Sequence, residues 1–197
     1  MPKNKIQPKA YLFPLPLAIV GANVNGKPNF ETIAYVGIVE YTPPLISVAS
    51  YETHHTNIGI KENGTFSVNT PSEDIVEKTD YCGLVSGREI DKSEVFDVFY
   101  GDLETAPMIS QSPLNLECKV VKILNLKDLV GVEKAHDIFI GKIVGAYADE
   151  EYLTDGSPDI RKLKPLTYSL GKYWKVGEEL AEAWKIGKSL KKKFNLD

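Results

Sequence analysis

The sequence has few cysteines and no long hydrophobic run. Its 197 residues include two cysteines, Cys82 and Cys118, which are too few for a disulfide framework and lack the spacing of metal ligands. No stretch approaches the roughly 18 continuous apolar residues that a membrane helix needs. The apolar run near the start is broken by Pro14 and Pro16, and no cleavage site of a signal peptide follows it. We therefore expect a soluble protein of the reducing cytoplasm that does not enter a membrane.

Familiar catalytic signatures are also missing. The chain has no G-x-S-x-G elbow, no H-E-x-x-H motif, no Walker loop and no G-x-G-x-x-G loop, which argues against a hydrolase or a nucleotide kinase. A zinc site is disfavoured because nothing in the sequence brings His136 to the adjacent pair His54 and His55. We expect neither a metal site nor a catalytic set of side chains.

The overall composition is that of an ordinary globular protein. Hydrophobic residues make up 43% and charged residues 25% of the chain, and a chain of this length buries one sizeable core. We therefore expect a single domain over residues 1–197. The net charge of −4 makes a nucleic acid an unlikely partner, and the lysines at 188 and 191–193 are expected to be solvated.

Most of the chain has the pattern of strands separated by turns. Asn25-Gly26 after an apolar run at 15–20 predicts a hairpin, because Asn and Gly tolerate a positive φ. Further strands are expected at 33–39 and at 45–50, where the second can be central because Pro43 and Pro44 precede it.

The second half of the chain predicts longer strands. A short strand is expected at 66–69, and two long ones at 115–126 and 136–148. The alternation of the first long strand breaks at Val120-Val121, as a β-bulge would make it. Residues 94–113 are rich in polar and turn residues, and we expect a long irregular excursion there.

Three helices are expected between and after these strands. One spans 53–64 and ends at Asn63-Gly64. A second begins at Thr70 as its N-cap and runs to about 81. The third, at 177–195, has an apolar stripe that must bury against the barrel or a second subunit. The fold class is therefore mainly β (α+β), with a barrel, helices in the connections and a C-terminal helix.

Several segments resemble the flavin reductase-like family and its flavoredoxin branch over roughly residues 10–175. The matching stretches are NF…G at 29–37, YTPPLISV at 41–48, TNI at 56–58, GTFSVN at 64–69, and DYCG, SGR and DK at 80–83, 86–88 and 91–92. The resemblance implies an FMN-binding split β-barrel and a homodimer. It also implies one FMN in each subunit, near the dimer interface.

Candidate cofactor-binding residues fall into two groups around the first helix. Backbone groups of Tyr35, Val36 and Gly37 can meet the polar edge of a flat isoalloxazine ring, although Gly37 can equally mark a bulge. The phosphate candidates lie where a strand meets a helix N-terminus, which attracts anions. They are Ser50, Tyr51, His55 and Thr56.

Five further candidates follow from the resemblance. Asn69 and Thr70 are placed near the ribityl chain, although a capping role explains Thr70 equally well. Cys82 and Gly83 suit a loop against the ring, and the alternative for Cys82 is a small buried hydrophobe. Tyr168 lies in a segment that resembles the family's closing aromatic segment, which lines the cofactor or the dimer contact.

Three functions remain open at this point. In the first, bound FMN accepts a hydride from NADH or NADPH and passes electrons to a second acceptor, so no dedicated acid or base is required. In the second, a flavoredoxin-like protein exchanges electrons with a redox protein such as a ferredoxin without using nicotinamide. In the third, a barrel without flavin is a dimeric binding protein.

Overall fold

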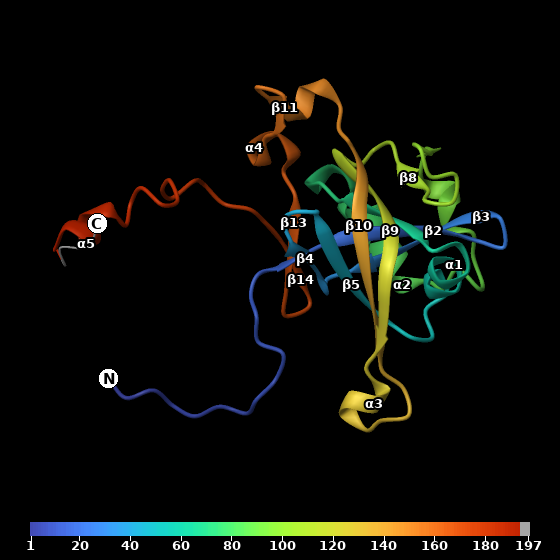
Figure 1. The fold of residues 1–197 in the computed structure, drawn as a ribbon, viewed down its shortest axis with the longest axis horizontal. Helices are drawn as coiled ribbons and strands as arrows, with labels where there is room; N and C mark the ends of the chain where they lie inside the picture. The colour runs from blue at the N-terminus through green and yellow to red at the C-terminus, as the bar shows by residue number, and fades with distance from the viewer. Residues whose placement is uncertain (194–197) are drawn as a thin grey trace.

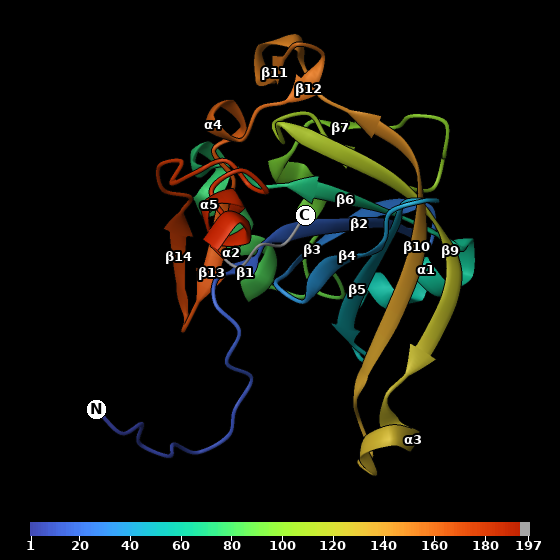
Figure 2. The same cartoon turned by 60° about the vertical axis from the view of Figure 1, so that its left-hand side comes forward.

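A curled antiparallel sheet of seven strands is the main feature of the computed structural model, which describes residues 1–193. The strand order is β3-β2-β6-β9-β10-β5-β4. The strands are β2 (Ala18–Val24), β3 (Lys27–Ile33), β4 (Val36–Glu40), β5 (Leu45–Tyr51), β6 (Thr65–Thr70), β9 (Leu114–Asn125) and β10 (His136–Tyr147). The sheet is strongly curled (Figure 2). As a result β5 contacts β3, where the Ser50 hydroxyl donates to Glu31. The predicted mainly β barrel is confirmed.

The first hairpin forms as the sequence predicted. Asn25 and Gly26 have φ angles of 51° and 76°, and Val24 pairs with Lys27 across the turn. Two consecutive positive φ angles give a hairpin turn whose twist matches that of the strands. The turn therefore fixes the register of β2 and β3.

The predicted start of the strand at 33–39 is wrong. Ile33 is the last residue of β3, where it pairs with Ala18, and β4 begins at Val36. Ala34 and Tyr35 form a break between the two strands. β5 lies between β10 and β4, so the prediction of a central strand after the prolines is confirmed.

Strands β9 and β10 form a long hairpin with the predicted bulge. Gly141 pairs with Val120 and Ile140 with Lys122, which leaves Val121 as the extra residue. The far end of the hairpin extends beyond the core and carries α3 (Lys127–Val130) at its tip (Figures 1 and 2). Both long strands are thus confirmed.

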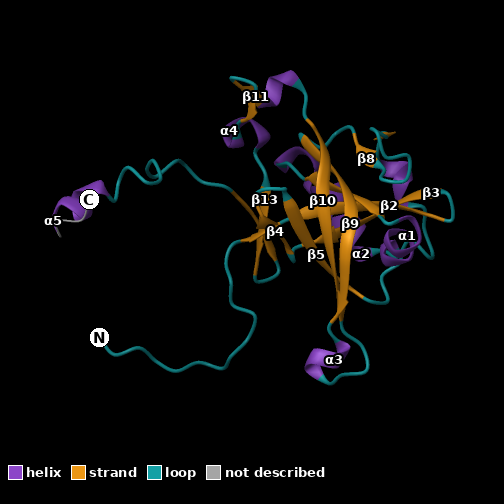
Figure 3. Cartoon of the chain, in the orientation of Figure 1, coloured by secondary structure: helices purple, strands orange, loops and turns teal. Residues whose placement is uncertain are grey.

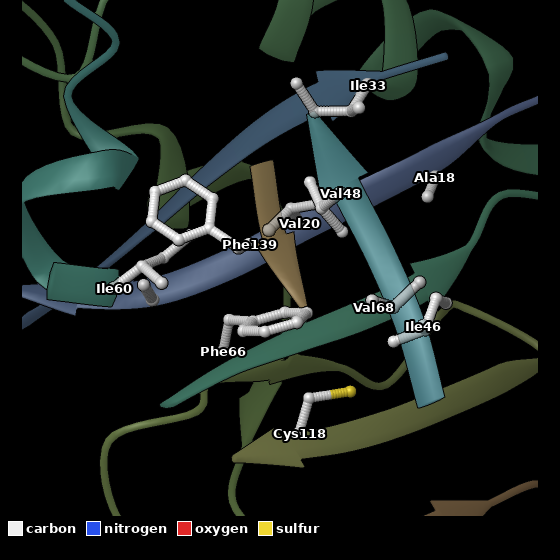
Figure 4. Close-up of a cluster of buried hydrophobic side chains, with 11 residues drawn as sticks. Ala18, Val20, Ile33, Ile46, Val48, Ile60, Phe66, Val68, Cys118 and Phe139 are labelled. Atoms are coloured by element: carbon white, nitrogen blue, oxygen red, sulfur yellow. The ribbon is translucent and has the colours of Figure 1, made fainter. Parts of the chain in front are cut away.

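The core lies inside the curled sheet. Three phenylalanines are fully buried, of which Phe66 and Phe139 face this interior (Figure 4). A second cluster around Phe30 lies on the other side of β2 and β3, beneath α2 (Val76–Leu84). Each fully buried side chain of this size contributes about 1.5–3 kcal/mol through the hydrophobic effect.

The first two helices begin later than predicted. α1 (Thr56–Asn63) begins three positions after the expected start and ends at Gly64, whose φ of 67° confirms the predicted stop. Thr70 is not an N-cap, because it pairs with Leu114 as the last residue of β6. The N-cap position is Ser72, which precedes a 3-10 turn (Glu73–Ile75) and α2.

The end of the chain differs most from the prediction. A small sheet of β1 (Leu15–Pro16), β13 (Leu166–Ser169) and β14 (Lys172–Lys175) was not foreseen. The helix expected at 177–195 is wrong over 177–187, which is irregular, and α5 (Lys188–Lys193) is short; residues 194 and 195 lie outside the described residues. Leu180 and Trp184 are 97% and 93% exposed, so their side chains do not pack against the described part of the chain. Figure 1 shows this segment running away from the barrel. A short helix that packs against nothing is only marginally stable in water.

Short elements complete the described part of the chain (Figure 3). They are the 3-10 turns at Lys92–Val95 and Glu150–Tyr152, β7 (Val98–Phe99), β8 (Met108–Ile109), β11 (Leu153–Thr154), β12 (Ser157–Pro158) and α4 (Ile160–Leu163). The excursion at 94–113 is mostly irregular, as expected. Among the described residues, none of the helices is both long and apolar enough to span a membrane.

Candidate functional site

A pocket of about 470 Å³ opens beside the break between β3 and β4. We call it the ring pocket. Ala34 and Tyr35 line it from the break, and Tyr51 lines it from the end of β5. Gly83, near the end of α2, and Tyr168 of β13 form other parts of the lining. The structure therefore brings together four predicted residues: Tyr35, Tyr51, Gly83 and Tyr168.

Aromatic rings and imidazoles form a row along this pocket. The ring centroids of Tyr35 and His136 are 5.7 Å apart, and those of His136 and Tyr51 are 5.4 Å apart, both edge to face. The row continues to His54, whose ring centroid lies 6.2 Å from that of Tyr51. Such contacts hold flat side chains in fixed orientations, and their edges and faces suit a planar aromatic ligand.

The β13–β14 hairpin is tied to α2 at the edge of the ring pocket. The Tyr173 hydroxyl donates a hydrogen bond of 2.7 Å to Oδ1 of Asp80. Burial and the neighbouring carboxylate raise the pKa of Tyr173, so this phenol stays protonated as a donor. Residues distant in sequence thus complete the pocket.

The buried carboxylate of Glu31 contacts His54, which lines the ring pocket. Nδ1 of His54 lies 3.1 Å from Oε2 of Glu31 and 3.2 Å from Oγ of Ser50. The hydrogen bond to Glu31 raises the pKa of His54 above its ordinary value, against the effect of burial. Both contacts fall on the same ring nitrogen, so the three side chains do not form a nucleophilic triad, in which the two contacts fall on different nitrogens.

A second pocket, of about 410 Å³, lies on the other side of the β5–α1 turn. We call it the polar pocket, and His55 lines it together with Arg88 and Lys27. Burial lowers the pKa of His55, and the charges of Arg88 and Lys92 lower it further. Nδ1 of His55 is buried and has no hydrogen-bond partner in the described chain. The adjacent residues His54 and His55 therefore line different pockets, and their pKa values are shifted in opposite directions.

Four predicted residues lie away from the ring pocket and have bonding partners of their own. Thr56 accepts a 2.7 Å hydrogen bond from Asn29, and Ser50 is held by Glu31. Asn69 is fully buried, donates to the backbone of Ile19 and accepts from that of Ile109. The backbone oxygen of Thr70 accepts from Ser112.

The remaining predicted residues divide between the core and the surface. Cys82 is buried in the cluster around Phe30, and burial raises its pKa to about 11, so the thiol is neutral at pH 7. Val36 is partly buried against the main core. Apart from Gly37 and its two chain neighbours, no described residue lies within 4 Å of a Cβ placed on Gly37, so the side on which this Cβ would lie is open.

Sequence reasoning missed Glu31, whose carboxylate contacts His54 of the ring pocket. Glu31 lies on the same side of β3 as Ile33, and a carboxylate on the inward face of a strand is a signal that could have identified it. Lys92 is 4% exposed, and its amine donates to the backbone oxygens of Cys82 and Val85. Burial lowers the pKa of Lys92.

The fold is of the split-barrel class, which is the fold of FMN-binding proteins of known structure. The structure is similar to flavoredoxin from Methanosarcina acetivorans, with a TM-score of 0.90 and 45% identity over 96% of this chain and 100% of that one. It is also similar to flavoredoxin of Desulfovibrio vulgaris (Miyazaki F), with a TM-score of 0.85 and 31% identity over 94% of this chain and 99% of that one.

The profile of the flavin reductase like domain matches residues 10–177. The chain belongs to this family. An uncharacterized protein of Archaeoglobus fulgidus is 30% identical over 164 residues, which are 82% of this chain and 88% of that protein. The resemblance seen in the sequence is confirmed.

Proposed function

We propose that residues 1–197 form one FMN-binding domain with the flavin ring in the ring pocket and the phosphate at the β5–α1 turn. The observation that carries this proposal is the position of His54 and His55. The two residues line adjacent pockets, one lined by aromatic rings and one polar. The unpartnered Nδ1 of His55 and the guanidinium of Arg88, which donates to the backbone of Thr53, add polar groups suited to an anion.

The residues proposed to contact the cofactor come from both sides of the turn. Tyr35, Gly83 and Tyr168 are placed against the ring, and the open backbone of Gly37 allows close approach. Tyr51, His55 and Thr56 are placed at the phosphate. Val36, Ser50, Asn69, Thr70 and Cys82 hold these groups in position from the strands and the core behind them.

The proposed activity is that of an NAD(P)H-dependent flavin reductase in the reducing cytoplasm, where its two free thiols remain reduced. When bound, FMN accepts a hydride and passes electrons onward, while the chain binds and orients it. Purified protein is expected to be yellow or to quench FMN fluorescence at a stoichiometry of one per subunit. Protein that binds no FMN would refute the proposal and leave the flavin-free binding protein.

A flavoredoxin-like electron carrier is the second candidate function, and the 45% identity to a flavoredoxin favours it. Anaerobic mixing of the FMN-loaded protein with NADH or NADPH separates the two candidates. Rapid bleaching of the flavin absorbance is expected for the reductase. A spectrum unchanged by either nucleotide but bleached by a reduced ferredoxin would assign the carrier function.

The proposed homodimer uses the exposed apolar side chains of the edge strand β4 and of Tyr41, which follows it. Ile38, Val39 and Tyr41 are 63%, 51% and 88% exposed within one chain. An unpaired edge strand that carries apolar side chains is prone to pair with another chain.

Ile38→Glu is therefore expected to weaken the dimer at least tenfold, because a buried unpaired carboxylate costs several kcal/mol. Sedimentation velocity at micromolar concentration measures the effect. The control is Ile160→Glu, which changes a 55% exposed residue of α4. A dimer that is equally stable in both variants would place the interface elsewhere.

A further inference from the structure

Both ends of the described chain leave the barrel as exposed arms. The N-terminal arm, residues 1–14, precedes β1, and the C-terminal arm, residues 180–193, follows β14 after a short connection and ends in α5. Because β1 and β14 both belong to the small sheet, the two arms start from one place in the fold. Figure 1 shows both arms running away from the barrel on the side where the small sheet and β4 lie.

The arms carry apolar side chains that the described residues leave uncovered. Leu180 and Trp184 of the C-terminal arm are almost completely exposed, and Ile186 and Leu190 are more than half exposed. Leu12 of the N-terminal arm is exposed to a similar degree. Single exposed apolar residues are ordinary on a soluble protein, but several of them gathered on one segment mark an interaction surface. We therefore expect another molecule to cover the arms.

A second copy of this chain has a use for the area that the arms offer. Stable dimers bury about 1,200–2,000 Å² of surface in total. Three partly exposed side chains on and after β4, Ile38, Val39 and Tyr41, supply only part of that area. A buried tryptophan adds about 150–250 Å², and a two-fold dimer makes each contact twice. The arms therefore add the surface that β4 lacks.

The arms are also long enough to reach across a neighbouring subunit. An extended chain spans at most about 3.3–3.6 Å per residue, so each arm can cover up to about 45 Å. The radius of gyration expected for a barrel of this size is about 15 Å. Because the arms leave on the side of β4, two copies that pair through β4 bring the arms of each over the other.

We propose that the arms of each subunit embrace the other subunit of the homodimer, with Leu180 and Trp184 buried against the barrel of the second copy. The inference rests on the proposed homodimer and goes beyond it, because it makes both ends of the chain part of the interface. A membrane surface fits the C-terminal arm less well. Segments that lie on membranes are typically amphipathic helices, whereas residues 177–187 are irregular and α5 has 6 residues.

The fluorescence of Trp184 tests whether the arm is covered. The chain has two tryptophans, so Trp174→Phe leaves Trp184 as the only one. At micromolar concentration, the flavin-free variant is expected to show emission shifted to shorter wavelength and protection from acrylamide quenching. Dilution that dissociates the dimer is expected to abolish both, with sedimentation velocity on the same samples giving the dimer fraction.

Three results of this measurement would overturn the proposal. The first is the emission of an exposed indole at every concentration. The second is a covered indole in a monomer, which would mean that the arm packs on its own barrel. The third is an emission shift that appears only with vesicles of anionic lipid, which would assign the arm to a membrane.

A substitution in the arm measures its contribution to the dimer. Leu180→Ala is expected to raise the dissociation constant of the dimer by about tenfold or more, because two buried leucine side chains are truncated in each dimer. The matched control is Leu129→Ala, the same change at an exposed residue of α3, which lies away from the arms (Figure 1). Its expected effect is less than about threefold. Equal dissociation constants for the two variants would overturn the role of the arm.

These tests use flavin-free protein, so their outcome is separate from that of the proposed function. A dimer weakened by Ile38→Glu but not by Leu180→Ala would keep the β4 interface and overturn the embrace by the arms. A protein that is monomeric at every concentration would refute both. A protein that gives the expected fluorescence and dissociation constants but binds no FMN would refute the proposed function and support this inference.

Discussion

Gly59→Ala is expected to lower the stability of the protein by about 2–3 kcal/mol, although alanine normally favours a helix over glycine by about 1 kcal/mol. Gly59 lies in α1, where the helix crosses β2. A Cβ at this position would overlap the backbone oxygen of Asn23 and lie 2.8 Å from its carbonyl carbon. The same oxygen accepts a hydrogen bond from Asn63, so neither backbone can move freely. The helix would have to lift from the sheet.

Urea unfolding of the flavin-free protein measures this change, with Gly177→Ala as the control. Gly177 has no atom within 4 Å of the added Cβ and lies outside the barrel, so its substitution is expected to change stability by less than about 0.5 kcal/mol. A Gly59→Ala variant as stable as the control would mean that α1 does not contact β2 this closely.

Glu117→Ala is expected to have a still larger effect, about 3–5 kcal/mol of lost stability. The Glu117 carboxylate is fully buried and accepts a 2.8 Å hydrogen bond from the Tyr147 hydroxyl. It also accepts from the backbone N–H groups of Gly101, Asp102 and Leu103, at 3.0–3.2 Å. Truncation leaves four donors without their acceptor. The loop at 101–103, part of the long excursion, then loses its hydrogen bonds to the side chain of β9.

Tyr147→Phe is the graded control, because it removes one donor and leaves the other three in place. Its expected cost is about 1 kcal/mol. Urea unfolding gives the stability of both variants, and hydrogen exchange at Gly101–Leu103 reports the loop directly. Exchange at these amides that is unchanged in Glu117→Ala would show that the carboxylate does not hold the loop.

Features set by neighbouring residues were predictable from the sequence. Asn25-Gly26 specifies its turn through the φ angles that these residues tolerate, and the break in alternation at Val121 marks a bulge without knowledge of the partner strand. Gly64 ends α1 for a similar local reason.

Features that depend on distant partners were not predictable in the same way. Thr70 has the sequence pattern of an N-cap, but its pairing with Leu114 keeps it extended. β13 gains an additional partner in β1, which is far away in the sequence. The apolar spacing after Gly177 suggested a helix, but no surface of the described residues packs over Leu180 or Trp184.

The sequence pointed to the β5–α1 turn, and the structure places His54 in the lining of the ring pocket and His55 in that of the polar pocket. The contact of Glu31 with Ser50 and His54 was not predicted, because it depends on the curling of the sheet. A contact between side chains far apart in the sequence leaves no local pattern to find.

The hydrogen bond between Tyr173 and Asp80 has a consequence for biosynthesis. All seven strands of the main sheet precede residue 148, so they leave the ribosome before the β13–β14 hairpin does. During that interval a nascent chain has its central sheet but lacks one wall of the cavity beside α2. Capture of a ligand there with full affinity must therefore wait until Tyr173 has left the exit tunnel.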